Sequence, residues 1–249
     1  MSGIRETLIC AVIFFFSMAA ASYSLALEAA PLTMPSMVPG ANPSVPPEQQ
    51  KTIPVEKVSS GALRIGDVQI DEETRSITFP ACVNMDKGLL EYLLVHSSGK
   101  THESLLRTTV KPYDLQLAFL LLGFKGTDHP ISYQGAPEKP KGEPVEITIT
   151  YDNKADQTTT LRPEQWIVKA EGNSRKDIGT VDWVFTGSMI MEGDFMAQRE
   201  GSIIAIFHDP AAVVDNTSTG GESDKIWFPK EGEVPPVGTS VALTIKALK

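Results

Sequence analysis

Cysteine, histidine and long hydrophobic runs are all scarce in this sequence. Of its 249 residues, two are cysteines and four are histidines. Cys10 lies in an N-terminal apolar stretch that we expect to be removed, so Cys82 is left as the only thiol of the mature chain. A single thiol excludes an intramolecular disulfide. The apolar neighbours of Cys82 predict a buried and unreactive side chain.

The longest apolar run, Leu8 to Ala21, is shorter than the ~20 residues that a membrane-spanning helix needs. Arg5 precedes it, and Ser24-Leu25-Ala26 places small residues at the two positions that a signal peptidase reads. We therefore predict a signal peptide over residues 1–26 and no transmembrane span after its removal. The alternative is an N-terminus retained as a membrane anchor. Cleavage predicts an exported protein that is periplasmic or associated with the cell envelope.

Positively charged residues are also fewer than negatively charged ones. The chain has 22 Lys and Arg against 31 Asp and Glu, a net charge of −9. Binding to nucleic acid needs a basic surface, so we expect no nucleic-acid partner. The net charge gives no clue to a substrate, and the expected interaction is with an unknown envelope partner or a small ligand.

Proline is abundant before the folded part of the chain. Residues 27–59 contain seven prolines and no hydrophobic period. Such a segment cannot bury enough apolar surface to offset the entropy of ordering, so we predict a disordered tether there. We predict one domain over residues 60–249.

Within that domain the patterns indicate mostly strands. Residues 145–151 alternate between apolar and polar side chains, as a half-buried strand does. Residues 112–122 read as a buried helix, with Pro112 at its first position and Gly123 just past its end. Asp209-Pro210 predicts a short second helix over about 210–215. The expected class is α+β, a mainly antiparallel sheet with these two helices.

Potentially reactive side chains gather in the segment from Gly88 to Leu106. It reads as a β-hairpin with the turn at residues 97–100, which pairs positions whose numbers sum to 197. Alternation then places His102 and Ser104 on one face, and His96 and Glu103 on the other. We take His96, His102, Glu103 and Ser104 as the candidate functional cluster.

Three interpretations of this cluster remain open. The first is a metal site that draws on His102, Glu103, His129 or His208, because imidazole and carboxylate suit zinc or iron. The second is a hydrolase pair of Cys82 and His102, oriented by a carboxylate. The third is a binding or structural module in which these side chains satisfy buried groups or recognise a partner.

Aromatic and glycine patterns add no chemistry of their own. Trp166, Trp183 and Trp227 each lie in a strand-like context, which favours core packing over a platform for stacking sugars. The sequence contains no glycine-rich phosphate loop.

From about residue 63 to residue 246 the chain resembles the YdjY domain family. The segments that carry the resemblance are Arg75-x-Ile77-x-Phe79-Pro-Ala81, Gly88-Leu-Leu-Glu-Tyr-Leu-Leu94, Gly99-Lys-x-His102-Glu-Ser-Leu105, Trp183-Val-Phe-x-Gly187-Ser188 and Gly201-x-Ile-Ile204. The resemblance implies an exported or envelope-associated bacterial protein with a single domain and no established activity. Family members often carry a histidine where this chain has Gln116, which weakens the metal interpretation here.

Iron–sulfur binding has been suggested for some relatives, but one mature cysteine cannot supply four thiolates, and we expect no cofactor. We therefore predict an exported envelope protein of unknown activity whose domain is a non-catalytic binding or structural module. The alternative is a metal-dependent envelope enzyme with a site around His102 and Glu103.

Overall fold

The computed structural model of the protein describes residues 54–153 and 157–248. The predicted signal peptide, residues 1–26, and residues 27–53 of the predicted tether lie outside the described residues. The last part of that tether is described, and Glu56–Ser59 forms strand β1, with all four residues exposed. Within the described residues, the first strand therefore lies before residue 60.

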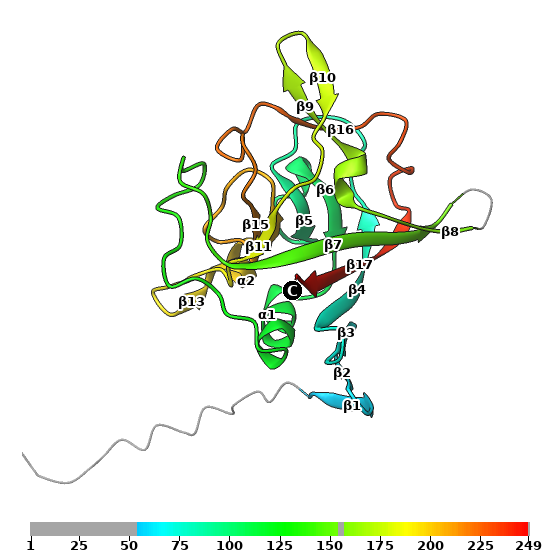
Figure 1. Ribbon diagram of the computed structural model, residues 1–249, viewed down its shortest axis with the longest axis vertical. Coiled ribbons are helices and arrows are strands. Elements are labelled where there is room, and N and C mark those ends of the chain that lie inside the picture. Colours follow the sequence, from blue (N-terminus) through cyan, green and yellow to red (C-terminus); the bar gives the residue numbers. More distant parts are fainter. Residues whose placement is uncertain (1–53, 154–156, 249) are drawn as a thin grey trace, which may run out of the picture. The chain divides into compact units, whose positions relative to one another are not determined.

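Eight strands form a sheet that closes on itself (Figure 1). In their order around the closed sheet they are β4 (Ser76–Val83), β17 (Ser240–Ala247), β7 (Glu143–Asp152), β11 (Trp183–Phe185), β15 (Val214–Asn216), β14 (Ser202–Ala205), β5 (Tyr92–His96) and β6 (Ser104–Thr108). The sheet closes where β6 pairs with β4, with Cys82 opposite Arg107. Neighbouring strands are antiparallel except for the parallel pairs β14–β15 and β5–β6.

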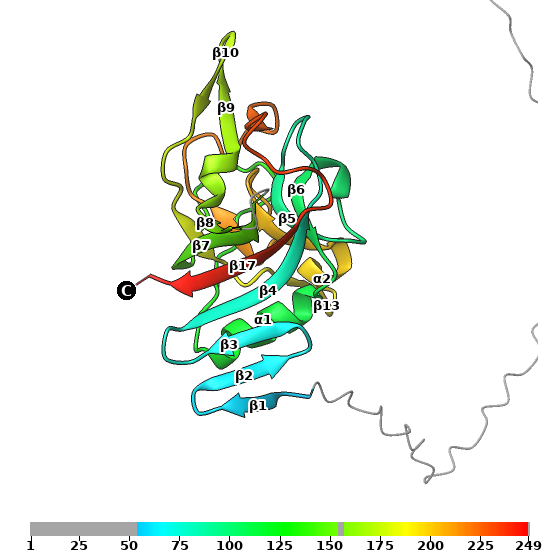
Figure 2. The ribbon, with the colours of Figure 1, turned by 90° about the vertical axis from the view of Figure 1, so that its right-hand side faces the viewer.

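The remaining strands extend this closed sheet or lie beside it. β1, β2 (Ala62–Ile65) and β3 (Val68–Asp71) continue from β4 as antiparallel hairpins, which lie side by side in Figure 2. β8 (Thr158–Leu161) pairs with the end of β7. β9 (Ile167–Glu171) pairs with β10 (Ser174–Asp177) and β16 (Trp227–Pro229) in a three-stranded sheet, and β12 (Ile190–Met191) pairs with β13 (Asp194–Phe195).

Alternating apolar residues build the core. Val145, Ile147 and Ile149 of β7 are buried, while the residues between them are partly exposed, because successive side chains of a strand point to opposite faces. In β17, Leu243 lies opposite Ile149 and is buried as well. The predicted strand over residues 145–151 is confirmed. All three tryptophans are also buried, as their predicted role in core packing requires.

Helix α1 (Pro112–Leu121) confirms the predicted helix over about residues 112–122. It buries Leu115, Ala118 and Phe119. The prediction of a buried helix holds for one side only, because Tyr113, Leu120 and Leu121 are exposed. The other helical elements are α2 (Met196–Glu200) and the 3₁₀ turns η1 (Thr101–Glu103) and η2 (Pro163–Trp166).

The predicted α+β class is wrong, and the fold is mainly β. In the described residues the α-helices are ten and five residues long, beside a twelve-stranded sheet and two smaller ones. The helix expected over residues 210–215 is absent from the described chain. Asp209 Oδ1 does accept a hydrogen bond from the Ala211 amide, as a capping residue would, but a turn follows and Val214 enters β15. Two adjacent β-branched valines, Val213 and Val214, favour that strand.

The predicted hairpin with its turn at residues 97–100 is also wrong. β5 and β6 are neighbours, but they run parallel, with Tyr92 opposite Ser104. The segment after His96 packs against the start of β14 instead of turning into β6. A Cβ at Gly99 would lie 2.9 Å from the Glu200 carbonyl oxygen, so this approach requires glycine. Both strands are almost entirely buried, which is typical of parallel strands and removes the alternation that fixes a hairpin register.

Candidate functional site

Two members of the predicted cluster, His102 and Glu103, lie together on turn η1 just before β6. His102 Nε2 is 3.4 Å from Glu103 Oε2, and the His102 side chain is 79% exposed. The expectation that these residues point to opposite faces is wrong, because they belong to a 3₁₀ turn and not to a strand. A contact with so exposed a partner is weak.

The other two members lie apart from each other. His96 is at the end of β5 opposite Thr108, and its Nδ1 is 2.7 Å from Ser98 Oγ. Ser104 is at the opposite end of the pair, buried, and donates to the Leu106 carbonyl at 2.7 Å. Four residues of strand separate the two ends, about 13 Å at the rise of a β-strand. The four side chains therefore do not converge on one site.

The metal and nucleophile interpretations gain no support from the described residues. His129 is exposed, and the buried His208 has its Nδ1 2.9 Å from the Ala136 carbonyl oxygen. Within residues 54–153 and 157–248, no three His, Cys, Asp or Glu side chains are placed to hold a metal ion. Cys82 is half-buried rather than buried, and its Sγ lies 3.5 Å from Arg107 Nε.

Behind η1, a chain of polar contacts leads from the surface into the core. Lys100 Nζ donates to the Tyr92 hydroxyl at 2.7 Å, and that hydroxyl donates to Asp209 Oδ2, also at 2.7 Å. The Gln134 amide bridges the Tyr92 hydroxyl and Glu91 Oε2, at 3.2 Å from each. Burial and the nearby Asp209 carboxylate raise the pKa of Tyr92, so its hydroxyl keeps its proton.

This chain ends at a second buried acid. Asp215 Oδ2 accepts from the Asp209 amide at 3.0 Å, and its Oδ1 accepts from the Asn216 amide at 2.7 Å. Burial, together with the Asp209 carboxylate, raises the pKa of Asp215 well above its ordinary value, although its two backbone bonds act in the opposite direction. Sequence reasoning missed these acids. The sequence signal for them was Asp209, which follows His208 at the end of a long apolar run, and Asp215, which comes six positions later.

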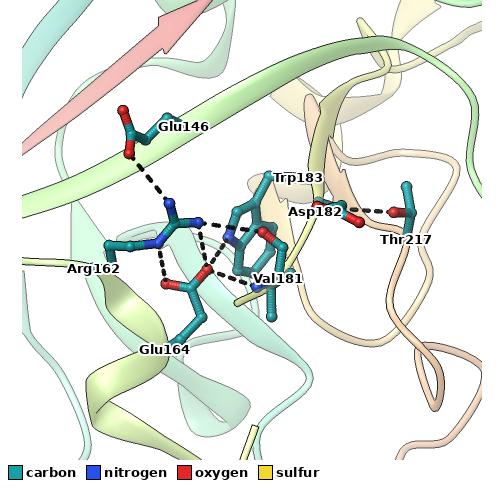
Figure 3. A network of polar contacts seen from close by, with 7 residues as sticks. All are labelled: Glu146, Arg162, Glu164, Val181, Asp182, Trp183 and Thr217. Carbon is teal, nitrogen blue, oxygen red and sulfur yellow. Dashed lines mark hydrogen bonds and ion pairs between the residues drawn. The ribbon is translucent and has the colours of Figure 1, made fainter. Parts of the chain in front are cut away.

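A different polar network joins η2 to β11 (Figure 3). Arg162 approaches the Glu164 carboxylate with two nitrogens, at 3.1 and 3.4 Å, and reaches Glu146 at 3.2 Å. Glu164 Oε1 also accepts from Trp183 Nε1 and from the Val181 amide, both at 3.1 Å. The hydrogen bond to Glu164 raises the pKa of Arg162. The network fixes η2 against β11.

An open groove lies beside this network, and we call it the β7–β8 groove. Its first part, of about 580 Å³, is lined among others by Arg162, Gln165, Thr180 and Lys230. Its second part, of about 520 Å³, is lined among others by Val234, Pro235 and Pro236. Tyr151 and Glu233 line both parts, so the two hollows adjoin each other. Each volume lies in the range of small-molecule sites.

The cations of the groove already have carboxylate partners. Arg162 is paired with Glu146 and Glu164, and Lys230 Nζ lies 2.8 Å from Asp177. The first part of the groove thus combines neutralised charges with the exposed polar side chains of Gln165 and Thr180. Because it is open and polar, it is the better candidate for a binding site than the closed chain behind η1.

The family model that matches this chain is that of the YdjY domain, over residues 68–246. No curated protein and no solved structure matches it. Among the helices of the described residues, none has the length and apolar character needed to cross a membrane.

Proposed function

We propose, from the premise that the chain belongs to the YdjY domain family, that the protein is exported to the bacterial cell envelope and that its domain is a binding module without catalytic activity. The N-terminal pattern supports export, because Arg5, the apolar run from Leu8 to Ala21 and the small residues Ser24 and Ala26 follow the order of a signal peptide. The bound species is an envelope partner or a small ligand.

The observation that carries the binding role is the β7–β8 groove. It offers two adjoining hollows of ligand size whose walls come from several separate segments of the chain. Tyr151 stands where its two parts meet. A groove of this kind can hold a ligand through many weak contacts.

The internal hydrogen bonds and ion pairs of these acidic and basic side chains favour a binding role over a catalytic one. A catalytic acid or base must come within about 3 Å of a reacting atom of the substrate. Asp209 and Asp215 are buried, and both oxygens of each carboxylate accept internal hydrogen bonds. In the groove, Arg162 and Glu164 are engaged with each other. Asp209 and Asp215 therefore stabilise the fold, while Arg162 and Glu164 hold the groove in shape.

Export is tested by expressing the full chain in a suitable bacterium and analysing the exported form by intact mass. We expect the mature protein to begin near Leu27. An exported form that still starts at Met1 would contradict cleavage, and retention of the whole product in the cytoplasm would contradict export.

The binding role is tested by NMR of the exported protein with a panel of three probes: a neutral tetrasaccharide, a proline-rich decapeptide and a basic decapeptide. We expect one probe to shift the amide signals of Gln165, Thr180 and Glu233 and to be recovered unchanged after prolonged incubation. Shifts confined to η1 would move the site to His102 and Glu103. Cleavage of a bound probe would show catalysis and overturn the proposal.

A further inference from the structure

The chemical character of the β7–β8 groove restricts its ligand. Its two hollows meet at Tyr151 and Glu233, so an occupant that fills both must be elongated. The side chains that line it come from β7, from the end of β8 together with η2, from the end of β10 with the segment after it, and from the segment from residue 230 to residue 239. An elongated ligand would contact all four segments at once.

Charge argues against an anionic ligand. The two cationic side chains of the groove, Arg162 and Lys230, are held by carboxylates at 2.8–3.2 Å. A phosphate or carboxylate group would have to displace Glu164 from a site where it also accepts from Trp183 and Val181. It would also meet the carboxylate of Glu233. Like charges in contact weaken such a complex.

The exposed polar side chains of the groove are suited to hydrogen bonds with hydroxyl groups of a ligand. Gln165 and Thr180 are exposed and supply neutral donors and acceptors, and Glu233 supplies an exposed carboxylate that accepts hydrogen bonds. Tyr151 adds an aromatic ring, held by an edge contact with Trp166 whose ring centroids are 5.3 Å apart. An aromatic face packs against the apolar C–H face of a sugar ring, while the hydroxyls at the edge of that ring face the polar groups.

We propose that the β7–β8 groove binds a linear, uncharged oligosaccharide, with one sugar ring stacked on Tyr151 and hydroxyl groups bonded to Gln165, Thr180 and Glu233. This inference rests on the proposed binding function and names the ligand class of the same groove. Arg162 and Glu164 act as positioning residues, because they hold η2, which carries Gln165, against β11.

The test is calorimetric titration of the exported protein with two neutral probes, a β-1,4-linked N-acetylglucosamine tetramer and maltotetraose. Binding of at least one probe is expected. Tyr151→Ala should weaken it at least tenfold, whereas Tyr151→Phe keeps the ring and should change it less than twofold. Gln165 is exposed, so Gln165→Ala tests the groove without disturbing the core, and a weakening of about threefold to tenfold is expected. His102→Ala, outside the groove, is the matched control and should bind like the wild type.

Several outcomes would overturn the proposal that the ligand is an oligosaccharide. One is binding of neither tetrasaccharide while a proline-rich or basic decapeptide shifts the groove signals, which would leave the binding function standing with a peptide as ligand. Another is sugar binding that is unaffected by Tyr151→Ala and Gln165→Ala, which would place the sugar elsewhere. If no probe gives binding heat or shifts the groove signals, both the proposed ligand class and the proposed binding function would be overturned. Circular dichroism melting of each variant separates a lost contact from a lost fold.

Discussion

Glu164 and Asp215 are both buried carboxylates, but their surroundings differ. The Glu164 side chain is 5% exposed and meets a guanidinium, an indole N–H and a backbone N–H. Asp215 is 1% exposed, and its two hydrogen bonds come from the backbone amides of Asp209 and Asn216. The first acid has a cationic partner in direct contact, whereas the second has another carboxylate nearby.

The difference shows how a buried acid can serve a fold in two ways. A carboxylate with a well-placed cation and further donors stays compatible with burial as an anion, and it ties together the segments that supply those donors. A carboxylate without a cation is relieved by binding a proton, which is why burial raises the pKa of Asp215. Glu164 is therefore an anchor for the groove, and Asp215 makes the stability of the core depend on pH.

Removing the anchor should have the largest effect. Glu164→Ala leaves the indole N–H of Trp183, the amide of Val181 and one face of Arg162 without an acceptor. Each buried donor left unpaired costs about 1–3 kcal/mol, and we expect a loss of about 3 kcal/mol in the free energy of unfolding, measured by urea denaturation. Glu146→Ala is the matched control, because Glu146 is a more exposed partner of the same arginine, and it should cost less than about 1 kcal/mol. Equal losses for the two variants would show that burial does not distinguish them.

Asp215 should appear in the pH dependence of stability. Its pKa is higher in the folded state than in the unfolded chain, so the folded state binds the proton more tightly. The stability that it contributes is fully present below the unfolded pKa of about 3.9 and is lost as the pH rises through the folded-state pKa. Each unit of difference between the two pKa values corresponds to about 1.4 kcal/mol.

Asp215→Asn removes this titration. We expect the stability of the wild type relative to Asp215→Asn to fall as the pH is raised from about 4 to 8, measured by urea unfolding at each pH. Asp67→Asn changes an exposed aspartate and should follow the wild type at every pH. A constant difference between wild type and Asp215→Asn over this range would mean that Asp215 titrates alike in the folded and unfolded states.

Tyr92→Phe sharpens the comparison by removing the link between Lys100 and the buried acids. Asp209 loses a donor at 2.7 Å, and Lys100 loses an acceptor at the same distance. We expect a loss of about 1–2 kcal/mol in chemical denaturation, less than for Glu164→Ala, because Asp209 keeps a backbone donor. Tyr133→Phe removes the hydroxyl of an exposed tyrosine and should change stability by less than about 0.5 kcal/mol. A loss no larger than that of Tyr133→Phe would exclude a stabilising role for the chain of contacts.

The sequence was informative where buried residues alternate along a strand or where particular residues mark the ends of a helix. β7 and β17 could be recognised because their buried residues alternate, and α1 because Pro112 and Gly123 mark its ends. The β5–β6 pair could not, because strands buried on both faces give no alternation and hence no register. Because the predicted register was wrong, His102 and Glu103 were also wrongly placed on opposite faces of a strand.

The groove and the buried acids could not be predicted from the sequence for a different reason. Tyr151, Gln165 and Glu233 converge only through the order of strands, which no local pattern encodes. The partner of Glu164 is the indole of Trp183, nineteen positions away and across a hairpin. Asp209 could be recognised as a capping residue, but its contact with Tyr92 spans 117 positions. Long-range pairing therefore decides the polar chemistry of this domain.

The pair of His102 and Glu103 has the smallest expected effect and serves as a reference for the two buried acids. Its 3.4 Å contact has one partner, His102, that is 79% exposed to water, where such a contact gains little and holding two side chains in place costs entropy. His102→Ala, Glu103→Ala and the double variant should each change the free energy of unfolding by less than about 0.5 kcal/mol, with a coupling energy of the same small size. Glu103 is less exposed than His102, so its replacement should cost the more of the two. A coupling above about 1 kcal/mol in the double-mutant cycle would mean that η1 holds this pair as firmly as the core holds Glu164, and burial would then fail to explain the ranking of the acids.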